Sequence, residues 1–233
     1  MIELKEVTKK FGKKKALDNV TTKINKGKIT GLLGPNGSGK STMLKLITDL
    51  NKPSSGKILI DGEEIGIKSK SRISYLPEID HFYPWMKISD AKKFVKTFYS
   101  DWQEERYQEL LQFLELEESM KIDKISKGMR AKAKLLLSFS RKADIVLLDE
   151  PLSGIDIFTR EKIIETIIKD YRAGEQSIII TTHEIKEVEN VMDEALFLKN
   201  GKIALQGEIE NLKEEKNLSL VDLMREVYGN GKQ

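Results

Sequence analysis

The sequence predicts an α/β fold in which helices flank a mostly parallel sheet, with an antiparallel β subdomain and a helical subdomain attached. Short apolar runs typical of buried strands alternate with helical stretches, and a glycine-rich turn joins one such strand to a helix. Residues 79–143 show helical periodicity with few strand signals. We therefore expect one domain over 1–233, with the helical subdomain at about 79–143 and a short helical tail at about 208–233.

The first half of the chain predicts three strands and a helix. Residues 2–7 alternate apolar and polar side chains, and residues 20–24 do so more loosely, which indicates an antiparallel edge sheet exposed on one face. Residues 29–33 form a nearly continuous apolar run, as expected of a central strand buried on both faces. Residues 41–50 then carry apolar side chains at helical spacing and stop near Pro53.

The second half predicts four more strands, at residues 144–148, 177–181, 195–198 and 203–206. Helical stretches at 155–171 and 184–192 lie between the first three, which favours parallel pairing. Residues 218–228 are amphipathic, and we expect the tail at 229–233 to fray.

Composition and charge argue against several classes of protein. The 40 basic and 37 acidic residues nearly cancel, with a formal charge of +3, so no nucleic-acid partner is expected. We interpret the basic clusters at 13–15 and 130–134 as solvated faces. Cysteine is absent, which excludes a thiolate metal site. Charges interrupt every apolar stretch well short of roughly 18 residues, and the first residues do not resemble a signal peptide. We expect a cytoplasmic chain that does not itself cross a membrane.

Residues 34–41, Gly-Pro-Asn-Gly-Ser-Gly-Lys-Ser, match the phosphate-loop pattern G-x-x-x-x-G-K-[ST] between a predicted buried strand and a helix. Glycines let successive backbone N–H groups point at phosphate oxygens, and the helix N-terminus favours anions. We expect Lys40 to reach the β and γ phosphates of ATP and the Ser41 hydroxyl to bind Mg²⁺. The alternative is an ordinary glycine turn capped by a serine. The other ATP-binding candidates in this segment are Gly34, Asn36, Gly37, Ser38, Gly39 and Thr42.

Three further polar side chains follow predicted strands. Asp149 and Glu150 end the run at 144–148, and a strand parallel to 29–33 would bring both to the phosphate-loop edge of the sheet. Asp149 is then placed to hold Mg²⁺ through water, and Glu150 to act as general base on the attacking water. His183 follows the next strand and is expected within reach of the γ-phosphate. The alternative for each is a purely structural role, and His81 stays unassigned.

The sequence resembles the ABC ATPase family over essentially its whole length. Five motifs occur in the family's order: the phosphate loop, Ser-Lys-Gly-Met at 126–129, Asp-Glu at 149–150, Ser-Gly-Ile-Asp at 153–156, and His183. The resemblance implies a phosphate-loop NTPase core whose active site is assembled only in a dimer. It implies that Asp156 lies in the loop between the two sites and that Phe11 stacks on adenine, with packing as the alternative for Phe11. It further implies a helix that opens with the signature residues and faces the partner's ATP; these residues are Ser126, Lys127, Gly128 and Met129.

Two positions depart from the family pattern. The usual signature is Leu-Ser-Gly-Gly-Gln, whereas residues 125–129 read Ile-Ser-Lys-Gly-Met, a variant similar to that of exporter-type systems. Lys127 adds a positive charge that either lies near the partner's nucleotide or faces solvent. Glu78 stands where the family commonly has the glutamine that senses Mg²⁺ and contacts the permease. We expect Glu78 still to bind Mg²⁺, with a neutral isosteric replacement as the alternative.

The function implied by the resemblance is ATP-driven transport. Two chains would bind ATP–Mg²⁺, form a homo- or heterodimer, and drive separate membrane-spanning permease subunits from the inner face of the cell membrane, as an exporter. Glu150, His183 and Lys40 would be catalytic. A soluble ABC ATPase of translation or DNA repair is the main alternative, although the chain has neither a second such domain nor a long coiled-coil insertion. A module that binds ATP without hydrolysing it is a further alternative, disfavoured by the intact motifs.

Overall fold

The computed structural model describes residues 1–183 and 185–229 and is built around a six-stranded sheet in the order β10-β9-β3-β8-β7-β6. Neighbouring strands from β9 to β6 are parallel, whereas β10 pairs antiparallel to β9. The predicted mostly parallel sheet is therefore confirmed. The strands are β3 (Ile29–Leu33), β6 (Ile73–Leu76), β7 (Ile145–Asp149), β8 (Ser177–Thr182), β9 (Glu194–Lys199) and β10 (Lys202–Glu208).

Helices cover both faces of this sheet, which explains why β3, β7 and β8 are buried along their whole length. Alternate residues of β7 face two separate cores: Val146 and Leu148 belong to the core under the helical region, whereas Leu147 packs with α1 (Lys40–Ile47). The continuous apolar runs of the sequence therefore reflect two buried faces rather than a buried helix.

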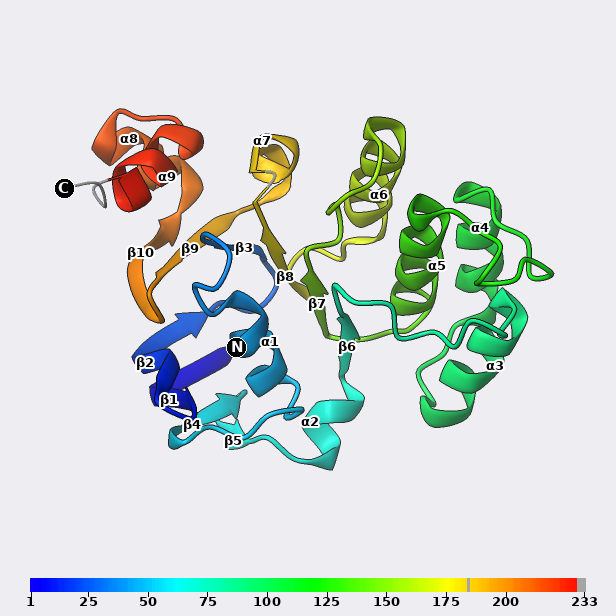
Figure 1. The fold of residues 1–233 in the computed structure, drawn as a ribbon, viewed down its shortest axis with the longest axis horizontal. Helices are drawn as coiled ribbons and strands as arrows, with labels where there is room; N and C mark the ends of the chain where they lie inside the picture. Colours follow the sequence, from blue (N-terminus) through cyan, green and yellow to red (C-terminus); the bar gives the residue numbers. More distant parts are fainter. Residues whose placement is uncertain (184, 230–233) are drawn as a thin grey trace.

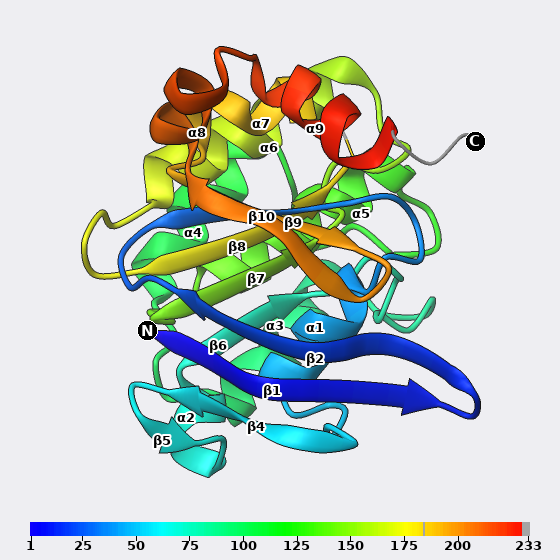
Figure 2. The same cartoon turned by 90° about the vertical axis from the view of Figure 1, so that its left-hand side faces the viewer.

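A second, antiparallel sheet has the order β2-β1-β4-β5 and lies alongside the central sheet (Figure 2). Its strands are β1 (Ile2–Phe11), β2 (Lys14–Ile24), β4 (Ser55–Ile60) and β5 (Glu63–Glu64). This confirms the predicted antiparallel subdomain, but the first two strands are longer than their alternation indicated. Irregularities in the β1–β2 register after Leu4 and Val7 interrupt the alternation of apolar and polar side chains. The alternation therefore does not reveal the full length of either strand.

The helices of the region 79–143 and those near the carboxyl end of the chain pack in the same core, on one face of the central sheet, and lie at opposite ends of it (Figure 1). The first group comprises α3 (Ile88–Phe98), α4 (Glu104–Phe113) and α5 (Lys127–Phe139). Residues 79–87 contain no helix. The second group comprises α8 (Ile209–Lys216) and α9 (Leu220–Gly229).

The remaining helices differ in detail from the sequence-based prediction. Helix α1 ends at Ile47, short of residue 50, and α6 spans Ile157–Asp170. The helix expected at 184–192 is a short α7 (Ile185–Val188) followed by a 3₁₀ turn (Glu189–Val191). Position 184 of that expected helix and positions 230–233 of the expected frayed tail lie outside the described residues. The helix α2 (Ile67–Ser71) and the strands β4, β5 and β6 were not predicted. Across the described residues, no helix is long and apolar enough to span a membrane.

Arg141 ties the helical region to the central sheet. Its Nη1 donates to the carbonyl of Ile73 at 2.8 Å, and its Nε lies 3.0 Å from Oδ1 of Asp101. The guanidinium also lies 3.4 Å from the ring centroid of Tyr99, and Arg141 is 4% exposed. Since Ile73 opens β6, this residue helps to hold the strand that leads to Glu78.

We predict that Arg141→Met lowers the free energy of unfolding by about 3 kcal/mol. The reason is that it leaves Asp101 and the backbone carbonyls of Ser71 and Ile73 without their buried partner. Urea unfolding followed by circular dichroism measures the change. Arg225→Met is the control, since Arg225 pairs with Asp222 at an exposed surface. Equal midpoints for the Arg141 variant and the unmodified protein would contradict this role.

Candidate nucleotide site

A cavity of about 420 Å³ lies where the central strands end, a volume typical of small-molecule sites. It brings together residues from six separate segments of the chain. The sequence-predicted residues that line it are Phe11, Asn36, Gly37, Gly39, Lys40, Ser41, Thr42, Glu78, Glu150 and His183. Gly34, Ser38 and Asp149 are buried and are not among the lining residues.

The loop between β3 and α1 needs glycine at positions where other backbone segments approach. A Cβ atom at Gly39 would lie 2.5 Å from the Ala16 carbonyl oxygen, and one at Gly34 would lie 2.5 Å from that of Leu198. Gly39 also has a φ of 116°, which side-chain-bearing residues rarely adopt. The Ser38 amide donates to the Pro35 carbonyl at 3.1 Å and so closes the turn. Glycine at these two positions therefore lets the loop pack directly against the backbone of β2 and β9.

Lys40 and Ser38 give this loop the donors that phosphate oxygens require. The Lys40 ammonium is 5% exposed, donates to the Gly34 carbonyl at 2.7 Å and lies 3.3 Å from Oε1 of Glu150. The Ser38 hydroxyl is buried and makes no hydrogen bond within the described part of the chain. An unpaired hydroxyl beside a buried cation at a helix N-terminus fits an anionic ligand such as the phosphates of ATP.

Asp149 and Ser41 form a pair of oxygen donors suited to Mg²⁺. Oδ1 of Asp149 accepts hydrogen bonds from the hydroxyls of Ser41 at 3.0 Å and Thr181 at 2.8 Å, and Oδ2 accepts from Tyr75 at 3.2 Å. Burial, together with the charge of Asp149, raises the pKa of Tyr75, so its hydroxyl stays a donor. Over residues 1–183 and 185–229, no group of three or more His, Asp or Glu side chains could hold a metal by itself. Mg²⁺ bound here would therefore share phosphate oxygens and water as ligands.

Glu150 occupies a strained position between two basic side chains. Its φ of 48° is unusual for a residue with a side chain, a conformation that costs on the order of 1–3 kcal/mol. Its backbone amide donates to the carbonyl and hydroxyl of Thr181, at 3.1 and 2.9 Å. Oε2 lies 2.8 Å from Nδ1 of His183, while Oε1 faces Lys40. The strand end thus directs this carboxylate into the cavity, where a reacting water would lie.

The signature residues lie apart from this cavity. Ser126 caps α5 by accepting a hydrogen bond from the Met129 amide at 3.1 Å, and none of residues 126–129 lines the cavity. The Lys127 side chain instead lies against Gly154 of its own chain, since a Cβ there would come within 2.3 Å of Nζ. Within one chain, the signature residues therefore do not reach that chain's own phosphate loop.

The two remaining predicted residues lie at the edges of the site. Asp156 caps α6, accepting from the amide and hydroxyl of Thr159 at 3.0 and 2.8 Å, and these hydrogen bonds keep the pKa of Asp156 below its usual value. Phe11 ends β1 with 51% of its surface exposed and lines the cavity, so it is not a core residue. Sequence reasoning missed Tyr75, whose strand was not predicted, and Thr181, which ends the predicted strand at 177–181 and could have been noticed there.

We predict that Gly39→Ala weakens binding of a fluorescent ATP analogue by at least about tenfold, because the added methyl group meets backbone and must deform the loop. Gly37→Ala is the matched control: Gly37 also has a positive φ of 78°, but nothing lies within 4 Å of its Cβ position. Fluorescence titration compares the two. A Gly39 variant that binds as tightly as the Gly37 variant would exclude the steric explanation.

The comparisons with known proteins agree on one family. The family model described as "ABC transporter" matches residues 17–153. The ABC transporter ATP-binding protein YtrB of Bacillus subtilis is 34% identical over 92% of this chain and 74% of its own length. The petrobactin import ATP-binding protein YclP of the same organism is 30% identical, over 98% and 92%. The lantibiotic transport ATP-binding protein SrtF of Streptococcus pyogenes is 32% identical, over 92% and 95%.

Solved structures give the same result. An ATP-binding subunit of an ABC transporter superimposes with a TM-score of 0.86 at 25% identity, over 97% of this chain and 99% of that one. The dimeric post-hydrolysis cassette MJ0796, bound to ADP and Pi, superimposes with a TM-score of 0.78 at 26% identity, over 89% and 98%. Over most of its length, this chain therefore shares both sequence and fold with these proteins, and it belongs to the ABC transporter family as an ATP-binding subunit with ATPase activity.

Proposed function

We propose that two copies of this subunit, or this subunit and a related one, clamp head to tail around two ATP–Mg²⁺ and so drive a separate membrane-spanning permease. The observation that carries the proposal is the incomplete site. The cavity contains Lys40, Ser41, Glu150 and His183, but no part of the signature at 126–129. The N-terminus of the 13-residue α5 is suited to an anion, and a second subunit would present it to the γ-phosphate.

The ion pair between Lys40 and Glu150 suggests how ATP binding prepares the reaction. The γ-phosphate takes over the Lys40 ammonium and leaves Oε1 of Glu150 to accept a hydrogen bond from water. Water attacks the γ-phosphorus, its proton passes to Glu150, and the bond to the β–γ bridging oxygen breaks to release ADP and phosphate. His183 and Lys40 stabilise the developing negative charge.

Mg²⁺ would be held by Ser41, by Asp149 through water and by Glu78. When bound, it would offset negative charge on the phosphates that Lys40 alone cannot neutralise. Phe11 would stack on adenine at the open end of the cavity. The unpaired Ser38 hydroxyl and the backbone N–H groups of the loop residues that line the cavity would donate to the phosphates. In the dimer, Asp156 would lie between the two sites.

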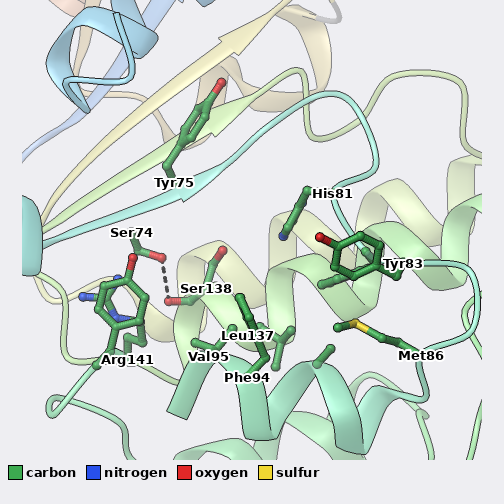
Figure 3. A pocket seen from close by; sticks show the side chains of 13 residues that line it. Ser74, Tyr75, His81, Tyr83, Met86, Phe94, Val95, Leu137, Ser138 and Arg141 are labelled. Carbon is green, nitrogen blue, oxygen red and sulfur yellow. Dashed lines mark hydrogen bonds between the residues drawn. The ribbon is translucent and has the colours of Figure 1, made fainter. Parts of the chain in front are cut away.

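An exposed apolar patch supports a protein partner close to this site. It consists of two aromatic pairs that are 56–67% exposed, Tyr83 with Trp85 and Phe94 with Phe98. Ile79, which directly follows Glu78, is 70% exposed. The patch borders a second cavity of about 220 Å³, where His81, Tyr83 and Met86 of the loop lie opposite α3 and α5 (Figure 3). Exposed apolar patches of this kind mark interfaces. We assign the patch to the permease and propose that the subunit works on the inner face of the cell membrane.

The direction of transport rests on the signature alone. The Ser-Lys-Gly-Met sequence at 126–129 resembles exporter-type systems, and export is therefore the direction we propose. One relative is named for import of petrobactin and another for transport of a lantibiotic, so overall similarity does not separate the two directions.

We predict that Glu150→Gln retains ATP binding, accumulates dimers and loses between about a hundredfold and ten-thousandfold of its turnover, the usual contribution of a general base. Size-exclusion chromatography with ATP–Mg²⁺ measures the dimer, and phosphate release measures turnover. Thermal stability without nucleotide checks the fold. Turnover at the unmodified rate would exclude Glu150 as the base.

We predict that the tagged Glu150→Gln subunit, trapped with ATP–Mg²⁺ in its native cells, co-purifies with a multi-span membrane protein after gentle solubilisation. Adding Trp85→Ala and Phe94→Ala should remove this partner without weakening ATP binding, since neither side chain lines the nucleotide cavity. Ile67→Ala is the control because Ile67 is 89% exposed on α2, outside the patch. Recovery of ribosomes, DNA-repair proteins or dimers alone would favour the soluble ATPase instead.

A further inference from the structure

Helix α5 presents a row of basic side chains to the segment that carries Glu78. Lys127, Arg130 and Lys134 are spaced by three and four residues and so lie along one face. The interpretation of 130–134 as a solvated face is wrong for Lys134, which is only 7% exposed. Residues 77–80 fold over this part of the helix, and their contacts could not be read from the helix's own sequence.

Lys134 holds the backbone on both sides of the Pro77–Glu78 peptide bond. Its Nζ donates to the carbonyl of Pro77 at 2.8 Å and to that of Glu78 at 3.0 Å, and it lies 3.9 Å from Oδ1 of Asp80. Burial lowers the pKa of Lys134, while the charges of Asp80 and Glu78 act in the opposite direction. This contact is a specific anchor, because separating the ammonium from the two carbonyls would leave buried polar groups without hydrogen-bond partners, which costs free energy.

Arg130 extends this connection to the beginning of the signature. Its Nε lies 3.1 Å from Oδ2 of Asp80, and its Nη1 donates to the carbonyls of Ile122 and Ile125 at 3.4 and 3.3 Å. Ile125 directly precedes Ser126. The segment with Glu78 and the turn that opens α5 are therefore fastened to the same helix, one turn apart.

The anchored segment borders the nucleotide cavity. A neighbouring polar cavity of about 270 Å³ is lined by Lys127 and Lys134 on the side of α5. Glu78, Glu150 and Ser153 line both cavities, so the two spaces adjoin. Lys134 also interacts electrostatically with Asp149. Glu78 adds a carboxylate to a site that already contains Asp149 and Glu150. Lys134 is a buried cation close enough to offset part of this negative charge.

We propose that Lys134 is a positioning residue of the ATPase, which holds Glu78 at the nucleotide site and makes that segment move with the signature helix. This inference rests on the proposed function. If α5 meets the partner's nucleotide while Glu78 meets the chain's own Mg²⁺, Lys134 links the two nucleotide sites of the dimer through one rigid helix. Lys134 itself does not line the nucleotide cavity.

The test measures turnover of the full-length protein at saturating Mg²⁺. Lys134→Met should lower kcat between about tenfold and a hundredfold, as small misplacements of an active-site group do. KM for ATP should stay within about twofold, because the phosphate loop is untouched and only positioning of Glu78 is lost. Lys132→Met is the control: Lys132 lies on the same helix, and its side chain makes no hydrogen bond or ion pair to the described residues.

A double mutant separates positioning from general destabilisation. If Lys134 acts through Glu78, adding Lys134→Met to Glu78→Ala should leave kcat unchanged within about twofold. Lys134→Gln, which keeps a donor without the charge, should fall between the unmodified protein and Lys134→Met. Unmodified turnover in Lys134→Met, or an equal loss with and without Glu78, would overturn the inference.

Hydrogen exchange gives a readout that does not depend on turnover. Backbone amides at 78–82 should exchange faster in Lys134→Met than in Lys132→Met, while those of the phosphate loop should not change. Unchanged exchange at 78–82 would overturn the anchoring role even if the unmodified protein hydrolysed no ATP. Faster exchange in a protein without ATPase activity would instead sustain the anchor and overturn the proposed function.

Discussion

The parallel register of β3, β8 and β7 is the constraint on which the site depends. Leu33 pairs with Thr182 and Asp149 with Thr181, so these three strands end at the same level of the sheet. The residues that follow the strands, Gly34, Glu150 and His183, must therefore emerge at one edge. Two buried faces hold this register, because a shift by one residue would exchange the side chains of the two cores. Packing far from the cavity thus determines which side chains meet in it.

Charge balance is a reason for the proposed second subunit, because a bound nucleotide needs more positive charge than the phosphate loop alone supplies. Lys40 is the cation of the phosphate loop, and it already faces Glu150. A nucleotide adds several negative charges to a cavity that also contains Glu78. Mg²⁺, Lys14 in the cavity lining, the helix N-terminus at Ser126 of a partner and the buried Lys134 are sources of compensation. The last two depend on α5, which gives this helix a central place in the proposed mechanism.

The sequence predicted the parts of the structure that depend on local pattern. The run at 29–33, the glycine loop and the acid-ended strand at 144–150 each carry their own signal, and the structure brings them together as expected. The strand β6 was missed because Ser74 and Tyr75 interrupt a run of only four residues. Burial of Lys134 could not be predicted, because it depends on a distant segment folding over the helix. The contribution of a partner's signature lies outside any single chain and remains a proposal.

A mixing experiment tests most directly the central claim that one subunit's signature completes the other's site. Lys40→Ala removes the phosphate-loop cation, and replacing Ser126 by a bulky Phe blocks the start of α5; each variant alone should be inactive. Mixed in equal amounts, they form heterodimers in which one site has both an intact Lys40 and an intact Ser126. If the two subunits share their sites, phosphate release should then rise well above that of either variant alone. Full activity of the Ser126 variant by itself, or a mixture no more active than its components, would contradict it.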